Sequence, residues 1–357
     1  MSDTPQKYLG ATGDVREGFE VDAGEIARFI GECTGATPAA ITVRQFQGGQ
    51  SNPTYMVESD AGNFVLRRRP PGVLLPSAHA IDREYRVIDA LSRAGVPVPK
   101  PVGYCADESR IGSAFYLMEH VPGRIFFDNA MPDLSAEERG AIYDAANAAL
   151  AALHSVDPEA VGLGDFGRPG NYLARQVARW SKQYAASKTQ DIPAMDKVIA
   201  WLEANVPDEV PARVAHGDFS FHNLIFHPTE PRVVAILDWE LATTGDPIAD
   251  LTYHGMEWYR PAGIDPRGSL VDKDLAALGL PDFDTYAARY CERVGRPPVE
   301  NLGYYKAFNL FRVAAIIQGI VARFEAGNAA DANAATQAAR VAPLAEAAWA
   351  EAQRAGA

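Results

Sequence analysis

The sequence predicts an α+β protein with two lobes, a small one built on an antiparallel β-sheet and a larger one that is mostly helical. Segments with strand periodicity dominate before residue 121, and segments with helical periodicity dominate after residue 134. A chain of 357 residues that is 47% hydrophobic can form two compact cores. A short strand pair between residues 224 and 237 lies within the helical part, so the larger lobe is expected to carry a β-hairpin.

The small lobe is expected to begin with a loose polar arm at 1–20, followed by a short amphipathic helix at 25–33 and one main helix at 81–94. Alternating or apolar runs predict its strands, which are 41–47, 54–58, 63–68, 102–105 and 114–120.

A glycine-rich segment separates the first two of these strands. Residues 48–52 read Gly-Gly-Gln-Ser-Asn and are expected to form a hairpin tip. Glycine allows a close approach of the backbone, so Gly49, Ser51 and Asn52 are candidates to bind phosphate groups. The alternative is that this segment only reverses the chain, as most Gly-Gly turns do.

The third strand and the main helix of the small lobe carry opposite charges. Alternation puts Val65 and Arg67 on one face of the strand. In the helix, Glu84 lies four residues before Ile88 and therefore points inward. A buried carboxylate needs a cation, and Arg67 is the natural partner. Alternatively, Glu84 only complements the helix dipole, and Arg67 belongs to a solvated basic patch at 67–69.

The boundary between the lobes is expected where the chain leaves the sheet. This gives a first lobe at 1–118, a hinge at 119–123 and a second lobe at 124–357. Ser135 and Glu138 have the spacing of a capping box and indicate the start of the helical region. Its further helices are predicted at 141–154, 171–186, 194–205, 283–293, 302–324 and 330–354.

Composition disfavours several classes of function. The formal net charge of −13 argues against a nucleic-acid partner and against binding to an anionic membrane surface. Three cysteines, Cys33, Cys105 and Cys291, have no metal-ligand spacing and are expected to be reduced, mostly buried thiols. The first 20 residues lack a signal-peptide pattern, and no run of 18 apolar residues predicts a membrane span. We therefore expect a cytoplasmic protein.

Polar residues with a distinctive spacing gather between residues 214 and 250. His216 and Asp218 are followed by Asn223, and the two apolar runs of the predicted hairpin then lead to Asp238. The hairpin would place Asn223 and Asp238 close together at its open end. Phosphoryl transfer uses one carboxylate to orient an attacking hydroxyl, and it uses hard oxygen ligands to hold Mg²⁺ against the phosphates. Each residue alone is typical of an ordinary loop, but the combination predicts a phosphoryl-transfer site.

The segments HGDFSFHN, ILDWE and GDPIADL, at 216–223, 236–240 and 245–251, resemble the aminoglycoside phosphotransferase and choline kinase superfamily. The chain looks most like the branch that includes the kinase-like domain of acyl-CoA dehydrogenase family members. The resemblance extends from about residue 46 to the last helices. It implies a two-lobed, protein-kinase-like fold, ATP and Mg²⁺ as cofactors, and a small acceptor with a hydroxyl group.

The resemblance also implies roles for individual residues. Asp218 would orient and deprotonate the acceptor hydroxyl, while Asn223 and Asp238 would hold Mg²⁺. Backbone groups of Glu119 and Val121 would pair with adenine.

The phosphates would be bound by the glycine-rich loop and by Arg67, held in place by Glu84. Many relatives have Lys where this chain has Arg67, so the charge is kept but the phosphate contact changes. The letters Asp-Phe-Gly at 165–167 precede the catalytic segment, whereas the metal-binding Asp of a kinase follows it, so we interpret them as a loop. Asp246 is expected to cap a helix that begins near Pro247 and to brace the catalytic segment.

The acceptor and its binding residues stay open. A hydroxyacid or hydroxyacyl thioester fits the branch of the resemblance, whereas an aminoglycoside fits an acidic protein. A non-catalytic nucleotide-binding regulator is a further alternative, but a regulator has no chemical need for Asp218. The last helix, rich in Ala, is interpreted either as exposed or as packing in a homodimer. Candidates to line the acceptor site are Tyr253, His254, Trp258, Arg260 and Arg312.

Overall fold

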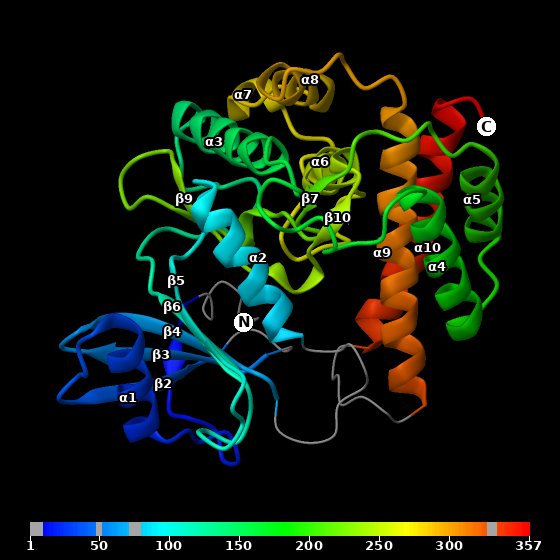
Figure 1. The fold of residues 1–357 in the computed structure, drawn as a ribbon. Coiled ribbons are helices and arrows are strands. Elements are labelled where there is room, and N and C mark those ends of the chain that lie inside the picture. The colour runs from blue at the N-terminus through cyan, green and yellow to red at the C-terminus, as the bar shows by residue number, and fades with distance from the viewer. Residues whose placement is uncertain (1–9, 48–51, 71–79, 327–333) are drawn as a thin grey trace. The chain divides into compact units, whose positions relative to one another are not determined.

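A computed structural model describes residues 10–47, 52–70, 80–326 and 334–357 (Figure 1). The contacts of the chain group into two compact units. The first unit comprises Met1–Phe127, Glu159–Leu163 and Phe221–Ala242. The second comprises Asp128–Pro158, Gly164–Ser220 and Thr243–Ala357.

The first unit is built on an antiparallel sheet of six strands in the order β1-β2-β3-β4-β6-β5. The five predicted strands are present, each within one residue of its expected ends, and the short β1 was not predicted. The strands are β1 (Thr12–Gly13), β2 (Ile41–Phe46), β3 (Thr54–Ser59), β4 (Gly62–Arg68), β5 (Pro101–Cys105) and β6 (Phe115–Glu119).

Two helices cover opposite faces of this sheet (Figure 1). The helix α1 (Ala23–Thr34) packs Ile26, Phe29 and Ile30 into a core with the apolar side chains Phe64 and Leu66 of β4. Because side chains alternate along a strand, Arg67 lies on the other face, where α2 (Ile81–Arg93) carries Glu84.

Two of the three cysteines are buried, in agreement with the expectation of mostly buried thiols. Cys105 and Cys291 are buried, but Cys33 is exposed. It lies in the last turn of α1, and residues 32–34 of that turn are all exposed.

The predicted β-hairpin forms from β8 (Leu224–Phe226) and β9 (Val233–Ile236). It belongs to the first unit, whereas the sequence placed it in the second lobe. Arg124 and Phe226 exchange two backbone hydrogen bonds of 2.8 Å, and the Ile236 N–H donates to the Pro97 carbonyl at 2.8 Å. Gly123 allows this close approach, because a Cβ there would lie 2.2 Å from the Phe226 carbonyl oxygen. The lobe boundaries predicted at 118–124 stay a prediction.

The second unit is mostly helical, as predicted. The long helix α9 packs against α4, α5, α6 and α10 (Figure 1). A two-stranded antiparallel sheet of β7 (Arg213–Ala215) and β10 (Thr243–Gly245) was not predicted. The helices are α3 (Ala136–His154), α4 (Tyr172–Ser187), α5 (Pro193–Ala204), α6 (Pro247–His254), α7 (Leu275–Leu278), α8 (Phe283–Arg293), α9 (Leu302–Glu325) and α10 (Ala334–Arg354). Short 3₁₀ turns are η2 (Phe221–Asn223), η3 (Trp239–Leu241) and η4 (Gly255–Trp258).

The predicted helix caps are present. The Ser135 side chain accepts a hydrogen bond of 3.2 Å from the Glu138 N–H at the start of α3. The Asp246 side chain accepts one of 2.8 Å from the Ile248 N–H at the start of α6, which begins at Pro247.

Within the part of the chain that the structure describes, α9 is the one helix long and apolar enough to cross a membrane. However, 67% of its most apolar stretch is buried inside the protein. A core helix passes the same test of length and composition, and α9 fits that description.

Candidate functional site

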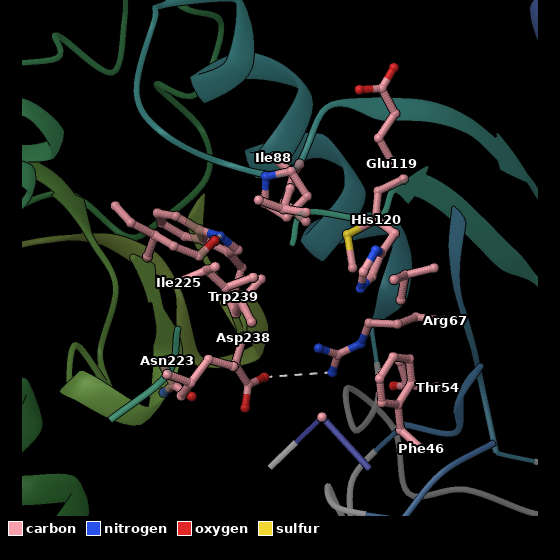
Figure 2. Close-up of a pocket in the computed structure, with 18 of the residues that line it drawn as sticks. Phe46, Thr54, Arg67, Ile88, Glu119, His120, Asn223, Ile225, Asp238 and Trp239 are labelled. Carbon is pink, nitrogen blue, oxygen red and sulfur yellow. Dashed lines mark hydrogen bonds and ion pairs between the residues drawn. The ribbon is translucent and has the colours of Figure 1, made fainter. Parts of the chain in front are cut away.

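A pocket of about 800 Å³ opens in the first unit, and all of its lining residues belong to that unit (Figure 2). One part of its wall is apolar and includes Val65, Met118 and Ile225. Another part is polar and includes Asn223 and Asp238. A pocket of this size, with an apolar wall and a few polar groups, is typical of a small-molecule site.

Arg67 stands at the centre of the polar part of the pocket. Its Nε lies 3.2 Å from Glu84 Oε2, and its terminal nitrogen lies 3.5 Å from Asp238 Oδ1 (Figure 2). Glu84 also accepts hydrogen bonds from Asn52 Nδ2 at 2.6 Å and from the Tyr116 hydroxyl at 3.0 Å. The strand–helix ion pair expected from the sequence is therefore present, and the Asn52 side chain supports it.

Burial acts against charge on both members of this pair. Burial raises the pKa of the Glu84 carboxyl above its usual range, although the nearby Arg67 lowers it. Burial also lowers the pKa of Arg67, but Glu84, Tyr116 and Asp238 outweigh it, so this pKa lies above its usual value. Arg67 is thus a permanent cation, 13% exposed, that faces the buried Glu84 carboxyl on one side and the pocket-lining Asp238 on the other.

The hairpin brings Asn223 and Asp238 together, because the Leu237 N–H donates to the Asn223 carbonyl at 2.8 Å. Asp238 has a φ of 64°, in the left-handed region that non-glycine residues rarely adopt and that recurs at functional sites. Its buried Oδ1 accepts no hydrogen bond among the described residues. An amide and a carboxylate whose oxygen lacks a hydrogen bond fit Mg²⁺, which takes few protein ligands beside phosphate and water.

The segment after β6 also lines the pocket, at Glu119, His120 and Val121. The N–H groups of Glu119 and His120 donate within the unit, to Lys100 and Asn63 at 2.8 and 2.9 Å. The N–H of Val121 donates no hydrogen bond within the described residues. The Glu119 side chain is paired with Lys100 and points away from the pocket, so only its backbone can serve a ligand there (Figure 2).

The glycine-rich loop is described only at its end. Gly49 and Ser51 lie outside the described residues. Asn52 lines the pocket, and its side chain holds Glu84.

In the second unit, the segment that contains Asp218 is held by α6. Asp250 accepts hydrogen bonds from two successive N–H groups, those of His216 and Gly217, the latter at 2.8 Å. Burial raises the pKa of the Asp250 carboxyl, but His154, His216 and the Gly217 N–H outweigh it, so the pKa lies below its usual value. Asp250 is therefore an anion, and it holds the segment that contains Asp218.

The expectation that Asp246 braces this segment is wrong. Asp246 caps α6 and accepts a hydrogen bond of 2.7 Å from the Tyr305 hydroxyl. The reason is geometric, because α6 packs against β7, which leads into His216, and Asp250 rather than the cap residue reaches that segment.

Asp218 itself is contacted by side chains of its own unit. Asp218 Oδ1 accepts a hydrogen bond of 2.7 Å from the Tyr253 hydroxyl. The buried ring of His216 accepts one of 3.2 Å from the Asp218 N–H, so His216 has a structural role. Arg312 donates to the carbonyl of Gly217, the preceding residue, at 2.7 Å.

Two other candidates for the acceptor site are core residues. His254 is 2% exposed and its Nε2 lies 2.8 Å from the Tyr286 hydroxyl. Arg260 is 1% exposed and forms ion pairs with Glu257 and Asp265. Both side chains are used within the fold.

The Asp-Phe-Gly letters at 165–167 form a turn, as expected. Gly167 packs against β10, where a Cβ would lie 2.2 Å from Thr244 Oγ1. This glycine serves close packing.

Comparison with known proteins identifies the family of the chain. A family model described as the phosphotransferase enzyme family matches residues 42–289. The chain belongs to the phosphotransferase enzyme family. It is 43% identical over 345 residues to acyl-CoA dehydrogenase family member 10 of Mus musculus. The matched region covers 96% of this chain and 32% of that protein. The chain thus spans about a third of the length of this relative.

Solved structures of the family share the fold. A candidate aminoglycoside phosphotransferase from Ralstonia eutropha superposes with a TM-score of 0.86 at 43% identity, over 94% of this chain and 99% of that one. A spectinomycin phosphotransferase solved with ADP and spectinomycin superposes with a TM-score of 0.60 at 12% identity, over 93% and 99%. The prediction of a two-lobed, kinase-like α+β fold is confirmed.

Proposed function

We propose that this phosphotransferase is an ATP- and Mg²⁺-dependent kinase that transfers the γ-phosphate to a hydroxyl group of a small molecule. The observation that carries the proposal is the pocket of the first unit, where the Arg67–Glu84 pair faces Asp238. A fixed cation for phosphate and hard oxygen ligands for Mg²⁺ are the groups that phosphoryl transfer requires.

In the proposed mechanism, Arg67 neutralises charge on the phosphates, and Glu84 keeps its guanidinium in place. Asn223 and Asp238 would hold Mg²⁺, which supplies further charge neutralisation when bound. Backbone groups at Glu119 and Val121 would pair with the edge of adenine.

Asp218 acts on the acceptor. Its carboxylate would orient the attacking hydroxyl and accept its proton late in the reaction, when the bond between the γ-phosphorus and the departing ADP oxygen is largely broken. Positioning therefore matters more than basicity. A non-catalytic regulator is disfavoured, because side chains of two other elements hold Asp218 and the residue before it.

The acceptor we favour is a hydroxyacid or a hydroxyacyl thioester. Arg312 is 8% exposed, contacts the segment next to Asp218, and forms no ion pair with any described residue. Burial raises the pKa of Tyr253, which contacts Asp218, and the charges of Arg267 and Arg312 lower it. The Arg312 cation next to the Asp218 segment favours an anionic acceptor over a polycationic aminoglycoside.

The subcellular location and the oligomeric state of the protein are proposals as well. We place it in the cytoplasm, where ATP is available, and we expect neither a nucleic acid nor a membrane as partner. Packing of two copies through α10 would give a homodimer.

The test is Mg²⁺-dependent consumption of ATP with a panel of hydroxyacids, hydroxyacyl thioesters, aminoglycosides, choline and sugars. We expect turnover with one anionic class and a fall in kcat of about 10²- to 10⁴-fold in Asp218→Ala, with MgATP affinity retained. Asp238→Ala should weaken MgATP binding.

The matched control is Asp165→Ala, at the loop that shares the Asp-Phe-Gly letters, and it should leave MgATP binding unchanged. A loss of kcat below about tenfold in Asp218→Ala, or an absence of MgATP binding by the wild type, would contradict the proposal.

A further inference from the structure

We propose that Tyr253 is a positioning residue for phosphoryl transfer, which fixes the orientation of the Asp218 carboxylate through its hydroxyl. The inference rests on the proposed function, since it assumes that Asp218 acts on the acceptor. It starts from the hydrogen bond of 2.7 Å between the Tyr253 hydroxyl and Asp218 Oδ1.

This contact is one of several hydrogen bonds between α6 and the segment that contains Asp218. Asp250 and Tyr253 are three residues apart on α6, which places both on one face of the helix. Asp250 holds the N–H groups of His216 and Gly217, and Tyr253 holds the side chain of Asp218. One helix face therefore fixes the backbone and the reacting side chain of three successive residues.

The ring of Tyr253 is itself held in place from α9. The Arg312 guanidinium lies 5.2 Å from the centroid of the Tyr253 ring, close enough for a cation–π interaction. The same Arg312 donates to the Gly217 carbonyl at 2.7 Å. Arg312 thus ties Tyr253 to the backbone next to Asp218, and the side chain of Tyr253 has little freedom to turn away.

The hydroxyl is a donor at any working pH. Burial and the nearby Asp218 raise the pKa of Tyr253 well above its usual value, and Arg267 and Arg312 only partly oppose this. A hydroxyl that stays protonated can only donate to the Asp218 carboxylate, so it favours one orientation of that carboxylate.

The variant Tyr253→Phe removes the hydroxyl and keeps the ring on which Arg312 rests. We expect kcat to fall about 10- to 100-fold, because a misplaced reacting group costs rate in this range. The KM for ATP should stay within about twofold. A fall in kcat without a change in KM indicates a positioning role, because a merely structural role would not separate the two.

The matched control is Tyr305→Phe. The Tyr305 hydroxyl also donates to an aspartate at 2.7 Å, but its partner, Asp246, caps a helix. This variant should lower the melting temperature and leave kcat unchanged. A purely structural role of Tyr253 would make the two variants behave alike.

A double-mutant cycle measures what the hydrogen bond contributes to stability, independently of its effect on kcat. The urea midpoints of Tyr253→Phe, Asp218→Ala and the double variant should be non-additive if the hydrogen bond contributes to stability. Unchanged kcat in Tyr253→Phe, with an active wild type, would overturn the positioning role. Coupled midpoints without any turnover by the wild type would overturn the proposed function, and the catalytic role of the contact with it.

Discussion

At the scale of the residue, the ion pair of Arg67 and Glu84 is the feature on which nucleotide binding should depend most. Glu84 is 2% exposed and holds three partners, which are Arg67, Asn52 and Tyr116. Removing one charge of a buried pair leaves the other uncompensated.

We predict that Glu84→Gln lowers the free energy of unfolding by about 3 kcal/mol and weakens MgATP binding. Urea unfolding and calorimetric titration measure the two effects. Glu108→Gln is the matched control, because Glu108 pairs with Arg69 at 3.1 Å on the exposed surface, where a pair contributes little. Equal behaviour of the two variants would show that the Glu84 pair has no special role.

A second prediction at this scale concerns pH. Burial lowers the pKa of His254 to about 4. The unfolded chain takes up this proton near pH 6.5, whereas the folded chain does so only near pH 4. The stability that neutral His254 supports is thus present above pH 6.5, and about 3 kcal/mol of it is lost as the pH falls from 6.5 to 4.

The variant His254→Gln should flatten this part of the curve of unfolding free energy against pH. His227→Gln, in the turn of the hairpin, replaces the same residue type at a partly exposed position and serves as the control. A wild-type curve with the same slope as that of His254→Gln would contradict the assignment.

At the scale of the element, the hairpin of β8 and β9 is the part that delivers both proposed Mg²⁺ ligands. Its attachment depends on Gly123, where any Cβ would meet the Phe226 carbonyl at 2.2 Å. A carbonyl that belongs to a hydrogen-bonded pair of strands cannot retreat without loss of those bonds.

We predict that Gly123→Ala lowers the free energy of unfolding by about 1–3 kcal/mol through overpacking. It should also weaken MgATP binding, because β8 begins directly after Asn223 and β9 leads to Asp238. Thermal unfolding with and without MgATP measures both effects. A variant with wild-type melting temperature and the same shift on addition of MgATP would contradict this account.

Most elements were predictable because they carry a long periodic pattern. The apolar face of 81–94 predicted α2, and alternation in 63–68 predicted which face of β4 bears Arg67. The strands β7 and β10 were missed because each has three residues and they lie far apart in the chain, so no turn between them marks a hairpin. The brace at Asp250 was misassigned to Asp246, since both residues fit the start of a helix and only packing distinguishes them.

At the scale of the whole molecule, the sequence predicted the fold class and the order of elements but not which segments pack together. The hairpin follows Ser220 in the chain, yet its contacts with Pro97 and Arg124 place it in the first unit. The contact between Tyr253 and Asp218 joins residues 35 apart and leaves no local pattern. Long-range contacts of this kind depend on the complete fold, so a reading of local periodicity cannot supply them.

The central claim is that the γ-phosphate of ATP passes to a hydroxyl group of an acceptor. The most direct measurement is ³¹P NMR of the wild-type protein with ATP, Mg²⁺ and the best acceptor of the panel. We predict loss of the γ-phosphate signal and the appearance of a phosphomonoester whose phosphorus couples to the carbinol proton of the acceptor, with neither change in Asp218→Ala. Formation of inorganic phosphate alone, or a phosphomonoester that forms equally well in Asp218→Ala, would contradict the account.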